Sequence, residues 1–292
     1  SLNPYRGCEH GCAYCYARRY HEFLGWSSGL DFESKLLIKP RAPELLRAEL
    51  SRKSWHAGKL ACSGVTDCYQ PVERRLRITR GLIEVLAEFR HAFSSITKSS
   101  GVERDIDLLA PLAADNLAAV YVSVATLDAA LARIMEPRAA SPERRIKTIE
   151  TLARAGIPVG VSVSPMIPFI NEPELERVLE RAQAAGATSA FATVLRLPWE
   201  VNPLFQQWLT THFPERASRV MARVHEMRGG RDNDPRFQTR LTGQGVWAHL
   251  LAQRFGAARV AFAEKTEVHG KRIGRLQHAR QVVRPRGAGG GE

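Results

Sequence analysis

Between residues 60 and 195, short apolar segments alternate with segments whose apolar residues recur at helical spacing. The apolar segments are rich in β-branched residues or end at glycine, which is typical of buried strands. Short links join the segments, and such alternation predicts parallel strands connected by helical crossovers. The expected strands are residues 60–64, 92–97, 120–124, 158–164 and 189–195, and the expected helices are residues 43–50, 82–89, 106–112, 146–156 and 175–186.

This alternation bounds both the fold class and the division of the chain. A sixth strand is expected before Cys8, and six strands in an α/β fold are too few for a closed eight-stranded barrel. The pattern stops near residues 227–230, after which residues 246–255 predict one more helix. We therefore expect two units, residues 1–228 and a helical, basic C-terminal extension of residues 229–292.

Three of the five cysteines form a C-x-x-x-C-x-x-C run of Cys8, Cys12 and Cys15. Three thiolates on one short loop can hold three corners of a four-iron cluster, which leaves one iron open to a small chelating cofactor. Zinc is the alternative, although structural zinc usually has four ligands in pairs and Cys62 and Cys68 are isolated. Five cysteines in 292 residues exclude a secreted disulfide framework.

The cysteine spacing is similar to that of the radical S-adenosylmethionine (SAM) enzymes. Residues 3–17, which begin NPYRGC and end CYA, resemble the branch that contains spore photoproduct lyase. The resemblance covers residues 2–230 and implies a partial (β/α)6 TIM-type barrel with parallel strands. It also implies a 4Fe–4S cluster on the three cysteines, SAM as cofactor, and an electron donor such as flavodoxin or ferredoxin. In that superfamily, reductive cleavage of SAM gives a 5′-deoxyadenosyl radical, which abstracts hydrogen from the substrate.

Polar residues collect at the carboxyl ends of the expected strands, where parallel α/β folds bind their ligands. Ser63 and Gly64 match the family's glycine-containing segment, whose backbone receives the amino group of SAM. A lysine and a serine stand at matching strand ends in the photoproduct lyases, so the resemblance assigns Lys98 to the SAM carboxylate and Ser123 to the ribose or carboxylate. The full set of expected cofactor-binding residues is Ser63, Gly64, Asp67, Lys98, Ser123 and Ser162.

Cys62 ends the second expected strand, so its thiol is expected at or just below the barrel mouth. The lyase resemblance implies that it donates a hydrogen atom to the product radical. Tyr14 and Tyr16 flank the last cluster cysteine and match tyrosines of the same hydrogen-transfer relay. The alternative is a buried cysteine that serves as a small apolar residue.

The substrate implied by the lyase is a nucleic-acid base, as in repair of a photolesion. Residues 66–73, 136–138 and 227–231 instead resemble a broad bacterial group of lyase-like proteins without an established substrate class, in which proline would stand at Cys68. Two alternatives stay open. One is a radical SAM enzyme for a peptide or small metabolite, and the other is a non-catalytic nucleic-acid-binding protein with zinc or a cluster.

The net charge of +12 bears on partners and location. Residues 259–286 hold eight Lys and Arg against two Glu, which predicts either contact with nucleic-acid phosphates or a solvated tail. No apolar run approaches the roughly 20 residues of a membrane span, so no membrane partner is expected. Free thiols, an oxygen-sensitive cluster and no recognisable signal peptide favour a reducing cytoplasm.

Overall fold

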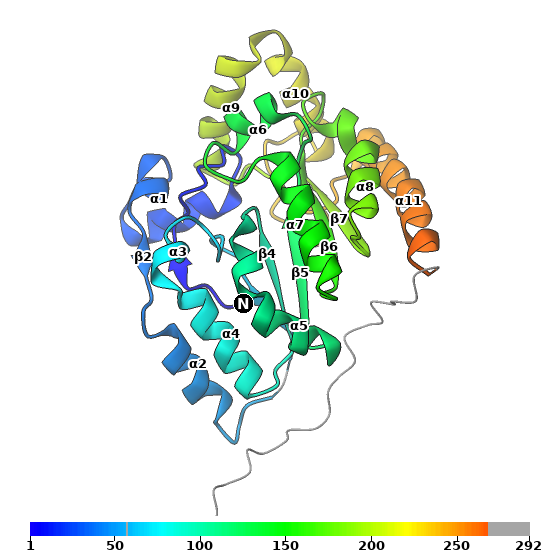
Figure 1. The fold of residues 1–292 in the computed structure, drawn as a ribbon. Helices are drawn as coiled ribbons and strands as arrows, with labels where there is room; N and C mark the ends of the chain where they lie inside the picture. Colours follow the sequence, from blue (N-terminus) through cyan, green and yellow to red (C-terminus); the bar gives the residue numbers. More distant parts are fainter. Residues whose placement is uncertain (57, 268–292) are drawn as a thin grey trace, which may run out of the picture.

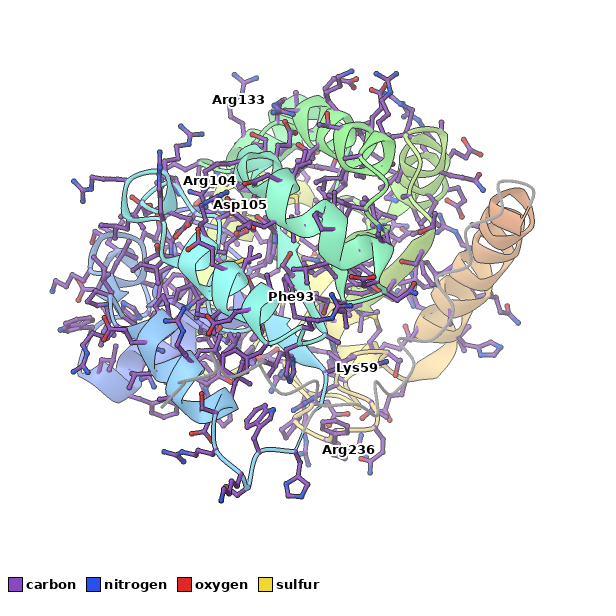
Figure 2. All side chains as sticks on the ribbon, turned by 60° about the horizontal axis from the view of Figure 1, so that its bottom comes forward. Lys59, Phe93, Arg104, Asp105, Arg133 and Arg236 are labelled. Carbon is purple, nitrogen blue, oxygen red and sulfur yellow. The ribbon has the colours of Figure 1, made fainter. Side chains whose placement is uncertain are left out.

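The computed structural model describes residues 1–56 and 58–267, and its centre is a parallel sheet of five strands in the order β3–β4–β5–β6–β7 (Figure 1). Spatial order follows chain order, as short right-handed crossovers produce. The α/β fold predicted from the alternating pattern is confirmed, and each of the five strands expected between residues 60 and 195 is present. The strands are β3 (Leu60–Cys62), β4 (Phe93–Thr97), β5 (Ala118–Ser123), β6 (Val159–Met166) and β7 (Ser189–Val194).

The strand expected before Cys8 is reduced to a single parallel bridge between Leu2 and Cys62. The Leu2 amide donates to the Ala61 carbonyl at 2.8 Å, and the Ser63 amide donates to the Leu2 carbonyl at 3.0 Å. The chain therefore enters along the edge of β3. It then forms β1 (Tyr5–Arg6), which pairs antiparallel with β2 (Leu37–Ile38).

Helices cover one face of the sheet, and Figure 1 shows α4, α5 and α7 in front of the strands. The expected helices are all present, whereas α9 and α10 were not expected. The helical elements are η1 (Tyr16–Leu24), α1 (Leu30–Ser34), α2 (Ala42–Leu50), α3 (Glu73–Leu76), α4 (Ile78–Glu88), η2 (Ser100–Asp105), α5 (Ile106–Ala114), α6 (Ala129–Met135), α7 (Pro142–Arg154), η3 (Glu172–Glu174), α8 (Leu175–Ala184), α9 (Val201–His212), α10 (Pro214–Met227) and α11 (Gly245–Glu267).

Helix α7 illustrates how the sequence sets an element's bounds. The hydroxyl of Ser141 accepts from the Arg144 amide and caps the helix, and Pro142 occupies the first helical position. Gly156, at φ 79°, follows the last turn, in a left-handed conformation that glycine adopts readily. These signals place α7 between β5 and β6.

Strand register divides the sheet into two chemically distinct faces. On the face covered by α5, α7 and α8, strands β5 and β6 carry fully buried valines (Val120, Val122, Val159, Val161 and Val163), and β4 adds the buried Ser95 and Thr97. The opposite, inner face is partly exposed and more polar. In register, it carries Ile96 and Lys98 of β4 and its end, Tyr121 and Ser123 of β5, Ser162 of β6, and Phe191 of β7.

The proposed division at residue 228 stays a prediction. Within the described residues, α11 packs against α8, α10 and β7, with Ala248 and Leu251 buried. None of the helices in the described part of the chain combines the length and apolar character that a bilayer crossing requires.

Candidate functional site

The three cysteines of the first fifteen residues lie on one loop beside the end of β3. The Cys8 amide donates to the Phe32 carbonyl at 2.9 Å, and the Ala13 amide donates to the Met135 carbonyl at 3.2 Å. Cys8 and Cys12 are buried, Cys15 is half-buried, and all three are free of disulfide bonds. We call residues 8–15 the cysteine loop.

The thiols of the cysteine loop are close enough to influence one another. Burial raises the pKa of Cys8 well above its usual value, and the charges of Asp67, Cys12 and Cys15 raise it further. Burial also raises the pKa of Cys12 to about 12, although the Lys98 ammonium opposes this effect. Cluster assembly on these thiols must therefore displace their protons, as metal binding to cysteine does.

Two arginines brace the cysteine loop from outside. Arg18 Nε donates to the Cys12 carbonyl at 2.9 Å, and Arg138 Nε donates to the Glu9 carbonyl. Both guanidinium groups pair with Glu33, which lies between them. A Cβ at Gly11 would clash with the Arg138 guanidinium, and Gly11 has φ 68°, so this position requires glycine.

Asp67 connects the loop to the end of β4. Its carboxylate accepts from the Thr97 hydroxyl at 2.7 Å and the Lys98 amide at 2.8 Å, and it lies 3.4 Å from His10 Nδ1. Burial alone raises the pKa of Asp67, but His10 and these hydrogen bonds outweigh burial and lower the pKa to about 2. Asp67 was expected to bind the cofactor. In the structure both carboxylate oxygens of Asp67 accept hydrogen bonds from protein groups, and two of these bonds, from Thr97 and Lys98, hold the end of β4 in place.

Lys98 is half-buried at the end of β4, on the inner face, with Nζ 5.9 Å from the centroid of the Tyr14 ring. Burial lowers the pKa of Lys98, but the nearby Cys12 and Glu136 raise it more, so the ammonium stays charged. Within the described residues it forms no salt bridge or side-chain hydrogen bond. A half-buried cation beside the cysteine loop, with no salt-bridge partner among the described residues, suits a ligand carboxylate.

A buried ion pair lies beneath the cysteine loop. Glu136 and Arg145 pair at 2.5 Å with almost no exposure, and the Tyr14 hydroxyl donates to Glu136. Arg145 Nη1 also donates to the Ser123 carbonyl at 3.0 Å, at the end of β5. Sequence reasoning noted residues 136–138 only as a resemblance, because no local pattern connects them with the loop.

The Ser63–Gly64 segment lies where it was expected, directly after β3. Ser63 has φ 83°, in the left-handed region, and its hydroxyl accepts from the Cys68 amide at 3.0 Å. A proline at position 68 would lack that donor. The Gly64 carbonyl accepts from the Tyr16 hydroxyl at 2.5 Å, so it links this segment to the cysteine loop. A Cβ at Gly64 would make only ordinary contacts.

The serines expected at the other strand ends are adjacent. Ser123 and Ser162 are register partners on β5 and β6, so they share the inner face with Lys98. The Ser162 hydroxyl is buried without a hydrogen-bond partner among the described residues. A buried hydroxyl without a partner on the inner face is the kind of group that a polar cofactor satisfies.

Cys62 does not share this face. Its register partner is Ser95, which lies in line with Val120 on the helix-covered face, whereas Ala61 faces the inner side. Cys62 is 1% exposed, and burial raises the pKa of its thiol to about 12. The alternation of side chains along a strand could have predicted that Cys62 lies on this face.

The basic segment 259–286, which was expected to contact nucleic-acid phosphates or to form a solvated tail, lies outside the residues whose side chains the structure describes.

Family comparison agrees with this geometry, since residues 2–182 match the model of the radical SAM superfamily. The chain belongs to the radical SAM superfamily. That membership confirms the enzyme class predicted from the cysteine spacing, and the superfamily implies a 4Fe–4S cluster and SAM. The residues present fit both groups. The three thiols on one loop suit the cluster, and Lys98 and the unpartnered Ser162 hydroxyl suit SAM. Within the described residues, no three His, Cys, Asp or Glu side chains converge on a position for a single metal ion.

Several uncharacterized proteins are similar to this radical SAM chain. One from Mycobacterium tuberculosis is 35% identical over 221 residues, and the chain spans about 65% of that relative's length. One from Methanocaldococcus jannaschii is 30% identical, and the match covers 73% of this chain and 76% of the relative.

Solved structures support the fold. A variant of spore photoproduct lyase aligns with a TM-score of 0.55 at 14% identity, over 74% of this chain and 61% of the lyase. A second variant, with bound AdoMet and dinucleoside spore photoproduct, aligns with a TM-score of 0.54 at 14% identity, over the same shares of the two chains. Likeness at this identity is a likeness of fold.

Proposed function

We propose that this chain holds a 4Fe–4S cluster on Cys8, Cys12 and Cys15 and uses it to cleave SAM. The cluster would supply one electron to the bound sulfonium, which breaks into methionine and a 5′-deoxyadenosyl radical. Lys98 would pair with the methionyl carboxylate, and the backbone of the Ser63–Gly64 segment would receive the methionyl amine. The observation that carries this proposal is the placement of the Lys98 ammonium beside Cys12 of the cysteine loop, with no salt-bridge partner for Lys98 among the described residues.

Iron and sulfide analysis of the anaerobically reconstituted protein tests the cluster assignment. We expect about four of each per chain in the parent and a loss of the cluster in Cys8→Ala, Cys12→Ala and Cys15→Ala. Cys68→Ala is the matched control, because it removes a buried thiol outside the loop. Full iron content in a loop variant would refute the ligand assignment, and one zinc ion per chain would favour the non-catalytic alternative.

We further propose that the substrate is a nucleic-acid base. The net charge of +12 supports a polyanionic partner, and a structural neighbour of the same fold is a lyase with a bound dinucleoside photoproduct. Anaerobic turnover with dinucleotide photoproducts, followed by mass spectrometry, tests the proposal. Turnover of a peptide or small metabolite, with no change in any dinucleotide, would favour the other radical SAM alternative.

The resemblance to the lyase supports Cys62 as the residue that donates a hydrogen atom to the product radical, with Tyr14 and Tyr16 as the relay. The placement of Cys62 on the helix-covered face favours the alternative, a packing role. The Tyr14 and Tyr16 hydroxyls donate to Glu136 and the Gly64 carbonyl. Free thiols and an oxygen-sensitive cluster support a cytoplasmic location, where a flavodoxin or ferredoxin would supply the electron.

A further inference from the structure

Three arginines near the end of β7 lie against aromatic rings. The segments involved are η1, the links that follow β7, and residues 229–244 before α11. We call these six residues the arginine–aromatic surface: Arg19, Arg196 and Arg240, with the ring partners Trp199, Tyr16 and Phe237.

The rings of this surface are exposed, although each already has a cation on one side. Arg19 Cζ lies 3.4 Å from the centroid of Trp199, which is 59% exposed. Arg240 Cζ lies 4.3 Å from the centroid of Phe237, which is 75% exposed. Several large aromatic rings exposed together on one surface are typical of an interaction site.

The guanidinium groups of the surface lack counter-charges. Within the described residues, none of the three forms a salt bridge or a side-chain hydrogen bond. The Nε atoms of Arg196 and Arg240 are buried and have no partner. Burial lowers the pKa of Arg196, and the charges of Arg240 and Arg19 lower it further, so the group is one of uncompensated like charges. Such a group attracts anions.

Hydrogen bonds to backbone groups hold this surface at the carboxyl end of β7. The Val194 amide at the end of β7 donates to the Leu241 carbonyl at 3.0 Å. The buried Arg228 donates to the Arg240 carbonyl at 3.0 Å and also to the Leu195 carbonyl. Arg196 lies over Tyr16, which is bonded to the Gly64 carbonyl of the candidate SAM segment. The surface therefore borders the site where the radical would form.

We propose that the arginine–aromatic surface binds an unpaired strand of nucleic acid, whose bases stack on the exposed rings and whose phosphates pair with the guanidinium groups. Stacking on aromatic side chains beside a cationic track is how proteins hold single strands. A duplex hides its base faces within the stack, and an acidic peptide offers few flat faces to three rings. The inference rests on the proposed nucleic-acid substrate and names its form and its path.

Fluorescence anisotropy with a labelled 12-residue oligothymidylate tests this surface on the full-length holoenzyme. We expect the single strand to bind more tightly than a duplex of equal length. Trp199→Leu should weaken binding on the order of tenfold. A triple Arg19→Gln, Arg196→Gln, Arg240→Gln variant should reduce the slope of log affinity against log salt by about 2, since each phosphate contact contributes about 0.7.

Arg90→Gln is the matched control. It removes one positive charge from the loop before β4, at the opposite end of the strands, where Arg90 pairs with Asp115. Circular dichroism and iron content should be unchanged in every variant, which would show that folding is intact. Unchanged strand affinity and salt slope in the triple variant would overturn the proposal, and so would tighter binding of the duplex or equal competition by polyglutamate.

SAM cleavage measured on the same samples separates this inference from the proposed function. A protein that cleaves SAM but binds no single strand overturns the arginine–aromatic surface and leaves the cofactor chemistry intact. A protein that binds the strand through these residues but cleaves no SAM supports the surface and refutes the proposed function.

Discussion

The Tyr14 hydroxyl donates to the carboxylate of Glu136, although the two residues stand 122 positions apart in the chain. Glu136 follows α6 and pairs with the buried Arg145 of α7. This contact connects the cysteine loop to the crossover between β5 and β6, which contains both α6 and α7. Because a buried ion must keep its partner, the loop and residue 136 depend on each other for their positions.

Substitution of Glu136 should therefore lower the free energy of unfolding more than substitution of Tyr14. Glu136→Gln leaves the Arg145 guanidinium buried without an anion and should destabilise the protein by about 3–5 kcal/mol. Tyr14→Phe removes one hydrogen bond but leaves the ion pair, so it should cost about 1–3 kcal/mol. Anaerobic guanidinium unfolding measures both. Equal losses would contradict the account of a buried pair supported by a tyrosine.

Asp67 should make stability depend on pH in acid. Its folded pKa is about 2, against about 3.9 in an unfolded chain. Because the folded value is lower, the carboxylate contributes fully above about pH 4 and loses its contribution as the pH falls towards 2. The contribution at neutral pH is about 2–3 kcal/mol. Asp67→Asn should flatten the unfolding free energy between pH 4 and pH 2, measured by denaturant titration. An unchanged slope in the variant would contradict this account.

Local periodicity was sufficient to predict the sheet. The strands around Val120 and Val161 are β-branched and bounded by turn residues, so their burial follows from the sequence alone. Helix α9 also has a readable helical pattern, with Val201, Phe205 and Leu209 at four-residue intervals. The two-residue strands β1 and β2 are too short to show any period.

The candidate site was less predictable than the fold. Lys98 and the Ser123–Ser162 pair could be placed because strand ends converge at one edge of a parallel sheet. The Glu136–Arg145 pair and the Arg18–Glu33–Arg138 brace could not, because their partners come from distant segments with no shared pattern. Cys62 was expected at the mouth, and the register instead places it on the helix-covered face.

Lys98→Ala tests the cofactor assignment. The variant should retain its cluster, because Lys98 is not a ligand, and should bind SAM about 1.5–3 kcal/mol more weakly, as expected for loss of a charge-assisted hydrogen bond. Anaerobic titration calorimetry measures the affinity. Lys147→Ala is the control, since Lys147 pairs with Glu150 on the outer helix α7. Wild-type affinity in the Lys98 variant would remove this residue from the site.

Cys62→Ala separates a hydrogen donor from a packing residue. The variant should keep its cluster and its SAM cleavage and lose on the order of 1 kcal/mol of stability, as for other small core truncations. Product analysis then decides the role. Aberrant products from an unquenched substrate radical would identify a donor, whereas the normal product at the normal rate would identify a packing residue, as the burial of Cys62 favours.

The central claim is that three cysteines and Lys98 form a site for reductive SAM cleavage. The most direct measurement is the yield of 5′-deoxyadenosine and methionine from SAM after addition of dithionite to the reconstituted protein. We predict equal amounts of both products in the parent and none in Cys8→Ala, Cys12→Ala or Cys15→Ala. A parent that holds four irons per chain but forms no 5′-deoxyadenosine, or a loop variant that forms it at the parent rate, would contradict the claim.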